Sequence, residues 1–431
     1  MTANNRKNSP KLDLQWQILI GILLGIGCGL LFGHFQKTGL HSGFFLGAQR
    51  TFQFGGDLFL RLLRMVIIPL VFSSVFMAVV NLGNVRKLGS IGLHTLLYYT
   101  ATTALAVLTG LVLVNIIHPG FGIDPAVLEQ LSIRKEIPQA VSAMEVGKKS
   151  VFFIILETFL GMVPDNIASA FAEGNVLQVI FFALVTAVVA GSLGGVTEPL
   201  TGVVSAIDRI MQKTVELIMR IAPVCIFFLV ASLTMDLGLP ALAALARYAV
   251  TVLLGLTIHA CISLPLLVFI ATRKNPLPLA KAAMPALLTA WSTASSAATL
   301  PLTMECCRER AKLSDRISSF VVTLGATINM DGTALYESVA VIFIAELLGI
   351  ALTLPMQLVI FFTATLAAVG AAAIPGAGLV TMAIVLSAVG MPLEGIGLIL
   401  VIDRLLDQFR TTVNVWGDIT AAAVVERLEH G

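Results

Sequence analysis

Eight long apolar stretches divide this chain, and they constrain its fold more than any other feature. They cover residues 16–35, 58–82, 91–118, 176–194, 211–233, 241–271, 317–350 and 395–425. A helix of about 20 apolar residues spans the hydrocarbon core of a bilayer, where every backbone N–H and C=O must pair within the protein because no water is present. The pattern predicts an all-α polytopic membrane protein with eight transmembrane helices.

The composition supports this class and excludes others. Hydrophobic residues make up 57% of the chain and charged residues 12%, about half the charged fraction of soluble domains. The net charge is only +2 and the basic residues are scattered, so no nucleic-acid partner is expected. The five cysteines form no C-x-x-C pair, which argues against a disulfide framework or a zinc site. The chain lacks HExxH, P-loop and GxSxG motifs, so we do not expect an enzyme or a cofactor.

Basic residues near the first two stretches predict the topology. Arg6, Lys7 and Lys11 precede the first stretch, and Arg86 and Lys87 follow the second. The positive-inside rule then puts the N-terminus in the cytoplasm, and an even number of spans returns the C-terminus there. The polar segment 121–150 would face outside. The first stretch has no convincing cleavage site, so we expect it to be retained as a helix.

Two further apolar segments, 279–303 and 354–389, contain residues that break helices. The first carries the sequence SSAATLP at 295–301, and the second carries GAAAIPGAG at 370–378. Proline, glycine and other small residues free backbone groups that lipid cannot satisfy, so such segments belong where the backbone lines a protein cavity. Two re-entrant helical hairpins, each followed by a polar-bearing span, would form an inverted repeat. Close-packed spanning helices of the small-xxx-small type are the alternative.

The last apolar stretch presents a stripe of polar side chains. At about 100° per residue, five of its positions fall within an arc of about 80° on a helix. They are Asp403, Asp407, Arg410, Asn414 and Asp418. Ionisable groups in a membrane usually mark a substrate or ion pathway. Three carboxylates against one guanidinium leave surplus negative charge, which predicts bound cations. A self-neutralising structural ion cluster is the alternative.

A second polar position interrupts the stretch 317–350. Glycines flank Asn329 and Asp331 in the sequence GATINMDGT at 325–333. An unwound helix exposes carbonyl oxygens, and carbonyl, amide and carboxylate oxygens are the ligands that hard cations prefer. Asn329 and Asp331 are therefore candidate cation ligands. Alternatively, Asp331 only accepts hydrogen bonds from backbone amides at a kink.

These motifs together resemble those of a known family. The sequences are SS at 295–296 with ATLP at 298–301, NMDGT at 329–333, PGAG at 375–378 and DQFRTTVNVWGD at 407–418. Further matches are RLLRM at 61–65, PLVF at 69–72, YY at 98–99 with TT at 102–103, NVLQVI at 175–180 and AP at 222–223. The chain resembles, over essentially its whole length, the dicarboxylate/amino acid:cation symporters, which are the glutamate transporter homologues.

This resemblance implies a homotrimer in the cell inner (plasma) membrane that works by an elevator mechanism. Each protomer would have eight transmembrane helices and two oppositely oriented hairpins. Residues 1–90 (helices 1 and 2) and 119–237 (helices 4 and 5) would form the scaffold, the latter including the trimer contacts. Residues 91–118 (helix 3) and 238–425 (helices 6 to 8 with both hairpins) would form the moving transport domain, followed by the tail 426–431.

The resemblance also implies a site for an acidic amino acid. Arg410 would bind the substrate's side-chain carboxylate, Asp407 its ammonium group, and Asp403 would orient the guanidinium. The remaining substrate contacts would be Ser296, Thr333, Gly378, Thr411 and Asn414. A carboxylate at Asp407 would be left unpaired by a substrate without an ammonium group, so L-aspartate or L-glutamate is favoured over C4-dicarboxylates. The residues do not separate aspartate from glutamate.

Sodium is the coupling ion that the resemblance implies. One site would consist of Gly325, Asn329, Asn414 and Asp418. A second would consist of Tyr99, Thr102, Thr103, Asn329 and Asp331, and a third of Thr327 with hairpin carbonyls near Ala368, Val369 and Ala371. Glu337 resembles the glutamate that family members which also move a proton have at this position. A buried glutamate can carry a proton because burial raises its pKa. A permanently paired or always protonated Glu337 is the alternative.

Other functions remain open at this point. A proton-coupled glutamate/aspartate or C4-dicarboxylate symporter is the nearest alternative. A passive anion channel is a second, since relatives conduct anions as a side activity. Substrate accumulation against a gradient would separate a carrier from a channel.

Overall fold

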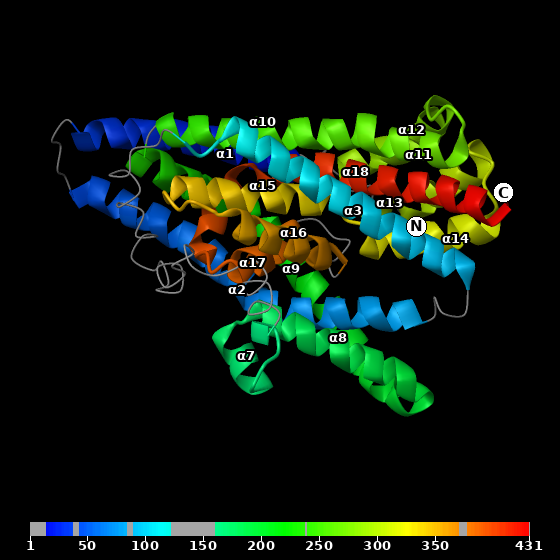
Figure 1. The fold of residues 1–431 in the computed structure, drawn as a ribbon. Coiled ribbons are helices and arrows are strands. Elements are labelled where there is room, and N and C mark those ends of the chain that lie inside the picture. The colour runs from blue at the N-terminus through cyan, green and yellow to red at the C-terminus, as the bar shows by residue number, and fades with distance from the viewer. Residues whose placement is uncertain are drawn as a thin grey trace, which may run out of the picture.

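The structure, a computed structural model, describes residues 14–37, 43–83, 89–121, 160–237, 239–369 and 377–430. Over these residues every regular element is a helix (Figure 1). The α-helices are α1 (Leu14–Lys37), α2 (Gly43–Gly83), α3 (Ser90–Ile117), α7 (Ile167–Glu173), α8 (Val176–Leu193), α9 (Glu198–Leu237), α10 (Leu239–Ile258), α11 (Leu264–Thr272), α12 (Leu277–Thr293), α13 (Ser296–Glu305), α14 (Asp315–Ile328), α15 (Asp331–Leu347), α16 (Leu354–Val369), α17 (Ala377–Ala388) and α18 (Ile396–His430). Four short 3₁₀- or π-helical turns join them: η3 (Gly194–Thr197), η4 (His259–Ser263), η5 (Cys306–Arg310) and η6 (Leu393–Gly395).

Six stretches of the described helices are long and apolar enough to cross a membrane. They are Trp16–Phe35, Gly47–Val80, Ser90–Ile117, Gln178–Met235, Leu242–Thr272 and Asp315–Leu347. Seven of the eight predicted stretches lie on them, because 176–194 and 211–233 both fall in Gln178–Met235. The eighth, 395–425, lies on α18, which is long enough but carries too many charged side chains to count among these apolar stretches. The predicted external segment beyond residue 121 and the second hairpin's tip, 370–376, lie outside the described residues.

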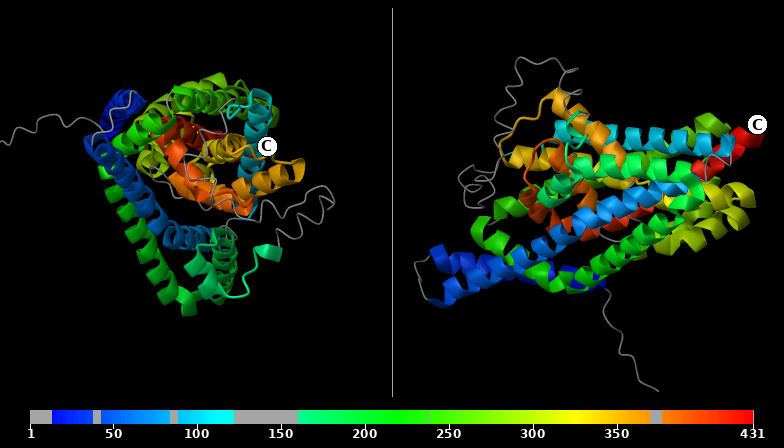
Figure 2. Two further views of the ribbon diagram at one scale, coloured as in Figure 1. Left: turned by 90° about the vertical axis from the view of Figure 1, so that its left-hand side faces the viewer. Right: turned by 90° about the horizontal axis from the view of Figure 1, so that it is seen from below.

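Helices α1, α2, α8 and α9 pack together along one side of the molecule (Figure 2). Four glycines spaced four residues apart let α1 approach α9 closely. A side chain added at Gly21, Gly25, Gly29 or Gly33 would lie 2.6, 2.8, 2.6 and 3.0 Å from the backbone carbonyl oxygens of residues 223, 227, 231 and 235. This is the small-residue packing by which membrane helices associate without a hydrophobic driving force.

A second group consists of α3 and the helices from α10 to α18, and α15 lies inside it. Every residue of α15 except Glu346 is buried, and its neighbours are α3, α10, α16, α17 and α18. A helix that is apolar on all sides is typical of a protein core or a membrane span, and burial on every side places α15 in the core. Its few polar groups therefore face other helices rather than water or lipid.

In two places in this second group, non-helical residues separate two consecutive helices. Helix α12 ends at Thr293, Ala294 adopts a left-handed conformation with φ of 49°, and the Ser295 hydroxyl caps α13 by accepting from the Ala298 N–H. Helix α14 ends at Ile328, and Asn329 is extended before α15 begins. Helices α12 and α13 pack on each other, as do α16 and α17. Both predicted breaks within the described residues are confirmed.

The end of α18 is tied to the starts of α3 and α14, at the right of Figure 1. The Ser90 hydroxyl donates to Glu429 at 2.7 Å, and the Ser314 hydroxyl donates to Glu426 at 2.7 Å. The pKa of the Glu429 carboxyl is lowered chiefly by the Ser90 hydrogen bond, with a further contribution from His94. These contacts hold the end of α18 against the first residues of α3 and α14.

Candidate functional site

Asn329, at the break between α14 and α15, is the centre of a buried polar cluster. Its amide nitrogen donates to Asp418 Oδ1 at 3.0 Å and to the Asn414 carbonyl at 3.3 Å. The Asn414 side-chain oxygen accepts from the Gly332 N–H at 2.8 Å. Polar side chains of α18 thus pair with the backbone that the break exposes. Asn329, Asn414 and Asp418 are brought together as predicted.

Asp331, the first residue of α15, is the centre of a neighbouring cluster. Its Oδ1 accepts from the Thr103 hydroxyl at 2.7 Å and from the Thr102 hydroxyl at 3.3 Å. Its Oδ2 lies 3.2 Å from His259 Nε2. All four side chains are buried. The structure therefore joins the predicted ligands Thr102, Thr103 and Asp331, and it adds a histidine.

Tyr99 and Gly325 line the space between these clusters. A side chain at Gly325 would contact both the Asp418 carboxylate and the Tyr99 hydroxyl. The Tyr99 hydroxyl itself donates to the Val321 carbonyl at 2.8 Å. Asp418 and Tyr99 can approach the α14 backbone this closely because residue 325 is glycine and has no side chain.

No lysine or arginine in the described part of the chain pairs with the carboxyl group of Asp331 or Asp418. The side-chain oxygen of Asn329 is also buried without a partner there. Burying a carboxylate costs free energy unless it is paired or coordinates a cation. Two carboxylates among amide, hydroxyl and carbonyl oxygens form a donor set suited to hard cations.

The residues predicted for a third cation lie on α14 and at the end of α16. The Thr327 hydroxyl donates to the Leu324 carbonyl of its own helix at 3.0 Å. Ala368 is buried near the end of α16 and Val369 is its last residue. Helices α14 and α16 are neighbours, and Ala371 lies outside the described residues.

Arg410 lies at the centre of a buried charge network on α18. Its Nη2 is 3.0 Å from Asp403 Oδ1 and 2.9 Å from Asp407 Oδ1. Its guanidinium carbon is 3.8 Å from the centre of the Tyr336 ring, and the Tyr336 hydroxyl donates to Asp403 at 2.6 Å. Nη1 and Nε of Arg410 have no partner within the described residues. Asp403 thus orients the guanidinium as predicted, and two of its N–H donor groups stay available.

Arg404 is a second arginine beside the polar stripe of α18, and the charge count from the sequence did not include it. Its Nη1 lies 3.2 Å from Asp407 Oδ2, and the side chain is buried. Arg404 and Arg410 therefore pair with Asp403 and Asp407, so the stripe has three acids against two bases rather than three against one, and a surplus of negative charge remains. Of the three aspartates of the stripe, Asp418 is the one without an arginine partner in the described part of the chain. The i, i+3 spacing from Asp407 was the signal that could have identified Arg404.

The other predicted substrate residues surround Arg410 to differing degrees. A side chain at Gly378 would contact the Arg410 guanidinium. The Thr333 hydroxyl accepts weakly from the Asn414 amide, at 3.4 Å. Ser296 and Thr411 are buried on α13 and α18, two helices that pack on each other. Among the described residues, the hydrogen bonds and ion pairs of the Arg410 guanidinium go to Asp403 and Asp407 and not to these two side chains.

Glu337 lies on α15, one helical turn beyond Thr333. It is fully buried, the Thr381 hydroxyl of α17 donates to its Oε1, and its Oε2 has no partner among the described residues. The carboxyl group therefore connects α15 to the helix that follows the second hairpin's tip.

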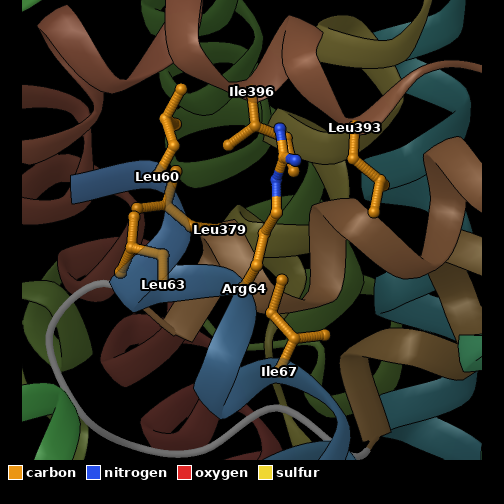
Figure 3. A pocket seen from close by; sticks show the side chains of 7 residues that line it. All are labelled: Leu60, Leu63, Arg64, Ile67, Leu379, Leu393 and Ile396. Atoms are coloured by element: carbon orange, nitrogen blue, oxygen red, sulfur yellow. The ribbon is translucent and has the colours of Figure 1, made fainter. Parts of the chain in front are cut away.

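A small cavity lies away from these polar groups, where α2 meets α17 and α18 (Figure 3). Its volume is about 20 Å³, and it is lined by Leu60, Leu63, Arg64, Ile67, Leu379, Leu393 and Ile396. It has room for about one water molecule, so it is no site for an amino acid.

The fold and this site define a class of protein. Several membrane-length helices surround a buried cluster of carboxylates, amides and arginine at a broken helix. Such clusters at discontinuous helices hold substrates and ions in membrane carriers. The molecule is a multi-pass membrane transporter.

Comparisons with known proteins identify the family. Residues 14–428 match the model of the sodium:dicarboxylate symporter family. The chain is 37% identical to excitatory amino acid transporter 3 of Oryctolagus cuniculus, over 97% of this chain and 86% of the relative. It is 38% identical to the same transporter of Mus musculus, over 95% and 84%. It is 36% identical to a putative sodium-dependent excitatory amino acid transporter of Caenorhabditis elegans, over 95% and 88%. The chain belongs to the sodium:dicarboxylate symporter family, which consists of transporters and not of enzymes.

Proposed function

We propose that this protein is a secondary active symporter that carries L-glutamate or L-aspartate across the cell inner (plasma) membrane with Na⁺. One observation supports this most strongly: Arg410 and Asp407 form a buried pair of opposite charges on the helix that also carries Asp418, while in the described part of the chain neither Asp418 nor Asp331 pairs with a lysine or arginine. The names of the relatives agree with an amino-acid substrate.

The substrate would compete with the protein's own ion pairs. Its side-chain carboxylate would bind the unpaired Nη1 and Nε of Arg410, because a planar guanidinium suits two-pronged contact with a carboxylate. Its ammonium group would bind Asp407 and displace Arg404 or Arg410 from that carboxylate. Ser296, Thr333, Gly378, Thr411 and Asn414 would complete the contacts. A dicarboxylate would offer no partner to Asp407, which favours amino acids.

Sodium would occupy the two oxygen-rich clusters. One ion would lie among Tyr99, Thr102, Thr103, Asn329 and Asp331. A second would lie among Gly325, Asn329, Asn414 and Asp418. A third ion at Thr327, Ala368, Val369 and Ala371 rests on the resemblance alone. The cations would supply the positive charge that these carboxylates lack, so an ion-free or half-loaded site would keep unpaired buried charge.

Glu337 favours an additional coupled proton. The side chain is fully buried and its Oε2 lacks a partner, a setting in which binding a proton relieves the cost of a buried charge. Proton-coupled transport of the same substrates is therefore the second candidate.

The domain arrangement follows from the two groups of helices. We propose that α1, α2, α8 and α9 form a trimeric scaffold with both termini of the chain in the cytoplasm. Helix α3 and the helices from α10 to α18, including hairpins at α12–α13 and α16–α17, would move as one unit in an elevator mechanism. This assignment gives eight spanning segments and two re-entrant hairpins.

Uptake of radiolabelled L-aspartate and L-glutamate into proteoliposomes tests the proposal. The assay compares an inward Na⁺ gradient, a proton gradient alone, and excess unlabelled succinate. We expect concentrative uptake that requires Na⁺ and that succinate does not inhibit. Uptake driven by protons without Na⁺ would contradict sodium coupling, and strong inhibition by succinate would contradict the amino-acid assignment.

A further inference from the structure

A buried histidine that the sequence motifs do not point to contacts the aspartate of the Thr102/Thr103 cluster. His259 Nε2 lies 3.2 Å from Asp331 Oδ2, and both side chains are 0% exposed. The other Asp331 oxygen accepts from Thr102 and Thr103. Because an ionised carboxylate only accepts hydrogen bonds, Nε2 must carry the hydrogen in this contact.

The second ring nitrogen of His259 makes no contact that competes with the one to Asp331. Nδ1 is buried and has no partner in the described part of the chain. The contact of Nε2 is therefore the polar contact through which this side chain acts on Asp331.

The backbone around His259 is shaped to hold this position. His259 is the first residue of the π-helical turn η4, in which the Leu264 N–H donates to the His259 carbonyl. The Trp416 indole of α18 donates to the neighbouring Ala260 carbonyl at 3.0 Å. π-Helical turns are rare, and within α-helices they are frequently found at functional sites. This one lies against both α3 and α18, the helices that supply the other polar groups.

We infer that His259 is a positioning residue for the coupling cation: its Nε2–H fixes the Asp331 carboxylate so that the remaining lone pairs face the ion. This inference rests on the proposed function, which assigns Asp331 to a sodium ion. Outer partners that orient a metal ligand are typically worth about 10- to 100-fold in metal affinity. His259 therefore contributes to Na⁺ affinity without touching Na⁺ or substrate.

Three substitutions separate this role from simple packing. The amide nitrogen of His259→Gln is as many bonds from the backbone as Nε2, so it can still donate to Asp331. His259→Asn carries the same amide but places its nitrogen where Nδ1 lies, which has no partner. His259→Phe keeps a ring and has no donor. We expect the Na⁺ concentration for half-maximal uptake to stay within about threefold of the original in the Gln variant and to rise about tenfold or more in the other two.

The measurement is the Na⁺ dependence of aspartate uptake by the purified full-length protein, at saturating aspartate. His94→Asn is the matched control, because His94 also pairs with a carboxylate but does so half-exposed at the start of α3. We expect no shift in that control. Equal Na⁺ dependence of the Gln and Asn variants, or an unshifted Phe variant, would overturn the inference.

The same experiment distinguishes a failure of the proposed function from a failure of the role given to His259. Uptake by the original protein that does not depend on Na⁺ would refute the proposed function. If uptake depends on Na⁺ but the Asn and Phe variants need the same Na⁺ concentration for half-maximal uptake as the original, only the role of His259 is refuted. If the Phe variant fails to fold, the comparison of Gln with Asn decides the question.

Discussion

At the scale of single residues, the site is governed by which buried charges already have partners. Asp403 and Asp407 are balanced within the protein by Arg404 and Arg410, whereas Asp418 has only the amide of Asn329. A balanced pair favours the substrate-free state, and an unbalanced carboxylate favours a bound cation. Under the proposed function, substrate and ion would therefore meet opposite electrostatic conditions on one helix.

Removing the charge of Arg404 tests the first of these conditions. Arg404 competes with the substrate's ammonium group for Asp407, so we expect Arg404→Gln to bind aspartate about tenfold more tightly, the magnitude of a hydrogen bond to a charged group. Titration of the purified protein with aspartate at saturating Na⁺ measures this. Arg308→Gln is the control, because Arg308 forms an exposed ion pair with Asp315, and such pairs contribute little. An affinity unchanged in Arg404→Gln would show that Arg404 does not compete for Asp407.

Glu337→Gln tests whether this buried carboxyl group carries a proton. Glutamine can still accept a hydrogen bond from Thr381 but cannot take up a proton. With Na⁺ equal on both sides, we expect an inward proton gradient to drive aspartate accumulation through the original protein and to have no effect on the variant. Uptake into proteoliposomes with an imposed pH difference measures this. Accumulation by the variant would refute the proposed role, and Na⁺-driven uptake by the variant shows that it is folded.

At the scale of secondary-structure elements, glycine spacing determines how closely α1 lies to α9. Gly21, Gly25, Gly29 and Gly33 repeat every four residues, and so do the α9 carbonyls that they contact. Side chains at these positions would force the two helices apart. Gly27, on another face of α1, has nothing within 4 Å of an added side chain.

Substituting these glycines by alanine tests the helix contact. An added methyl group at Gly29 would lie 2.6 Å from the Ala231 carbonyl, and such overpacking typically costs about 1–3 kcal/mol. We expect Gly29→Ala to lower the Tm of the detergent-solubilised protein. In contrast, Gly27→Ala should leave the Tm unchanged or raise it, because alanine favours a helix. Equal Tm values for the two variants would mean that the close α1–α9 contact does not stabilise the protein.

At the scale of the whole molecule, the proposed scaffold meets the proposed moving unit at the cavity in Figure 3. Leu63 of α2 lines one side, and Leu379 of α17 and Leu393 of η6 line the other. A link across this boundary would join the two groups of helices. A link within one group would leave their relative motion free.

Cross-linking tests the division into two moving parts. In a variant without native cysteines, we expect a short bifunctional thiol reagent to reduce uptake more than tenfold when cysteines replace Leu63 and Leu379. The pair at Leu379 and Leu393 is the control and should keep most of its uptake, because both positions belong to the moving unit. Full uptake by a cross-linked Leu63–Leu379 pair would contradict an elevator motion between these groups. Mass spectrometry confirms that each link has formed.

Much of the fold was predictable from local sequence. Seven of the eight predicted apolar stretches lie on the six described membrane-length stretches, and the breaks at Ala294 and Asn329 occur where small and polar residues interrupt apolar segments. The stripe on α18 followed from helical periodicity. Most of the predicted site residues are buried, and the roles of Thr327 and Ser296 stay predictions.

The sequence by itself determined the class of protein, the positions of its helices and the side chains that had to be buried, because hydrophobic length and helical periodicity act along the chain. Only the tertiary structure decided which of those buried groups contact one another. Asp331 receives its partners from α3 and from His259 of the π-helical turn, and Tyr336 pairs with Asp403 from another helix. The partners are far apart in sequence, so no local pattern specifies them; packing of the helices around α15 brings them within reach.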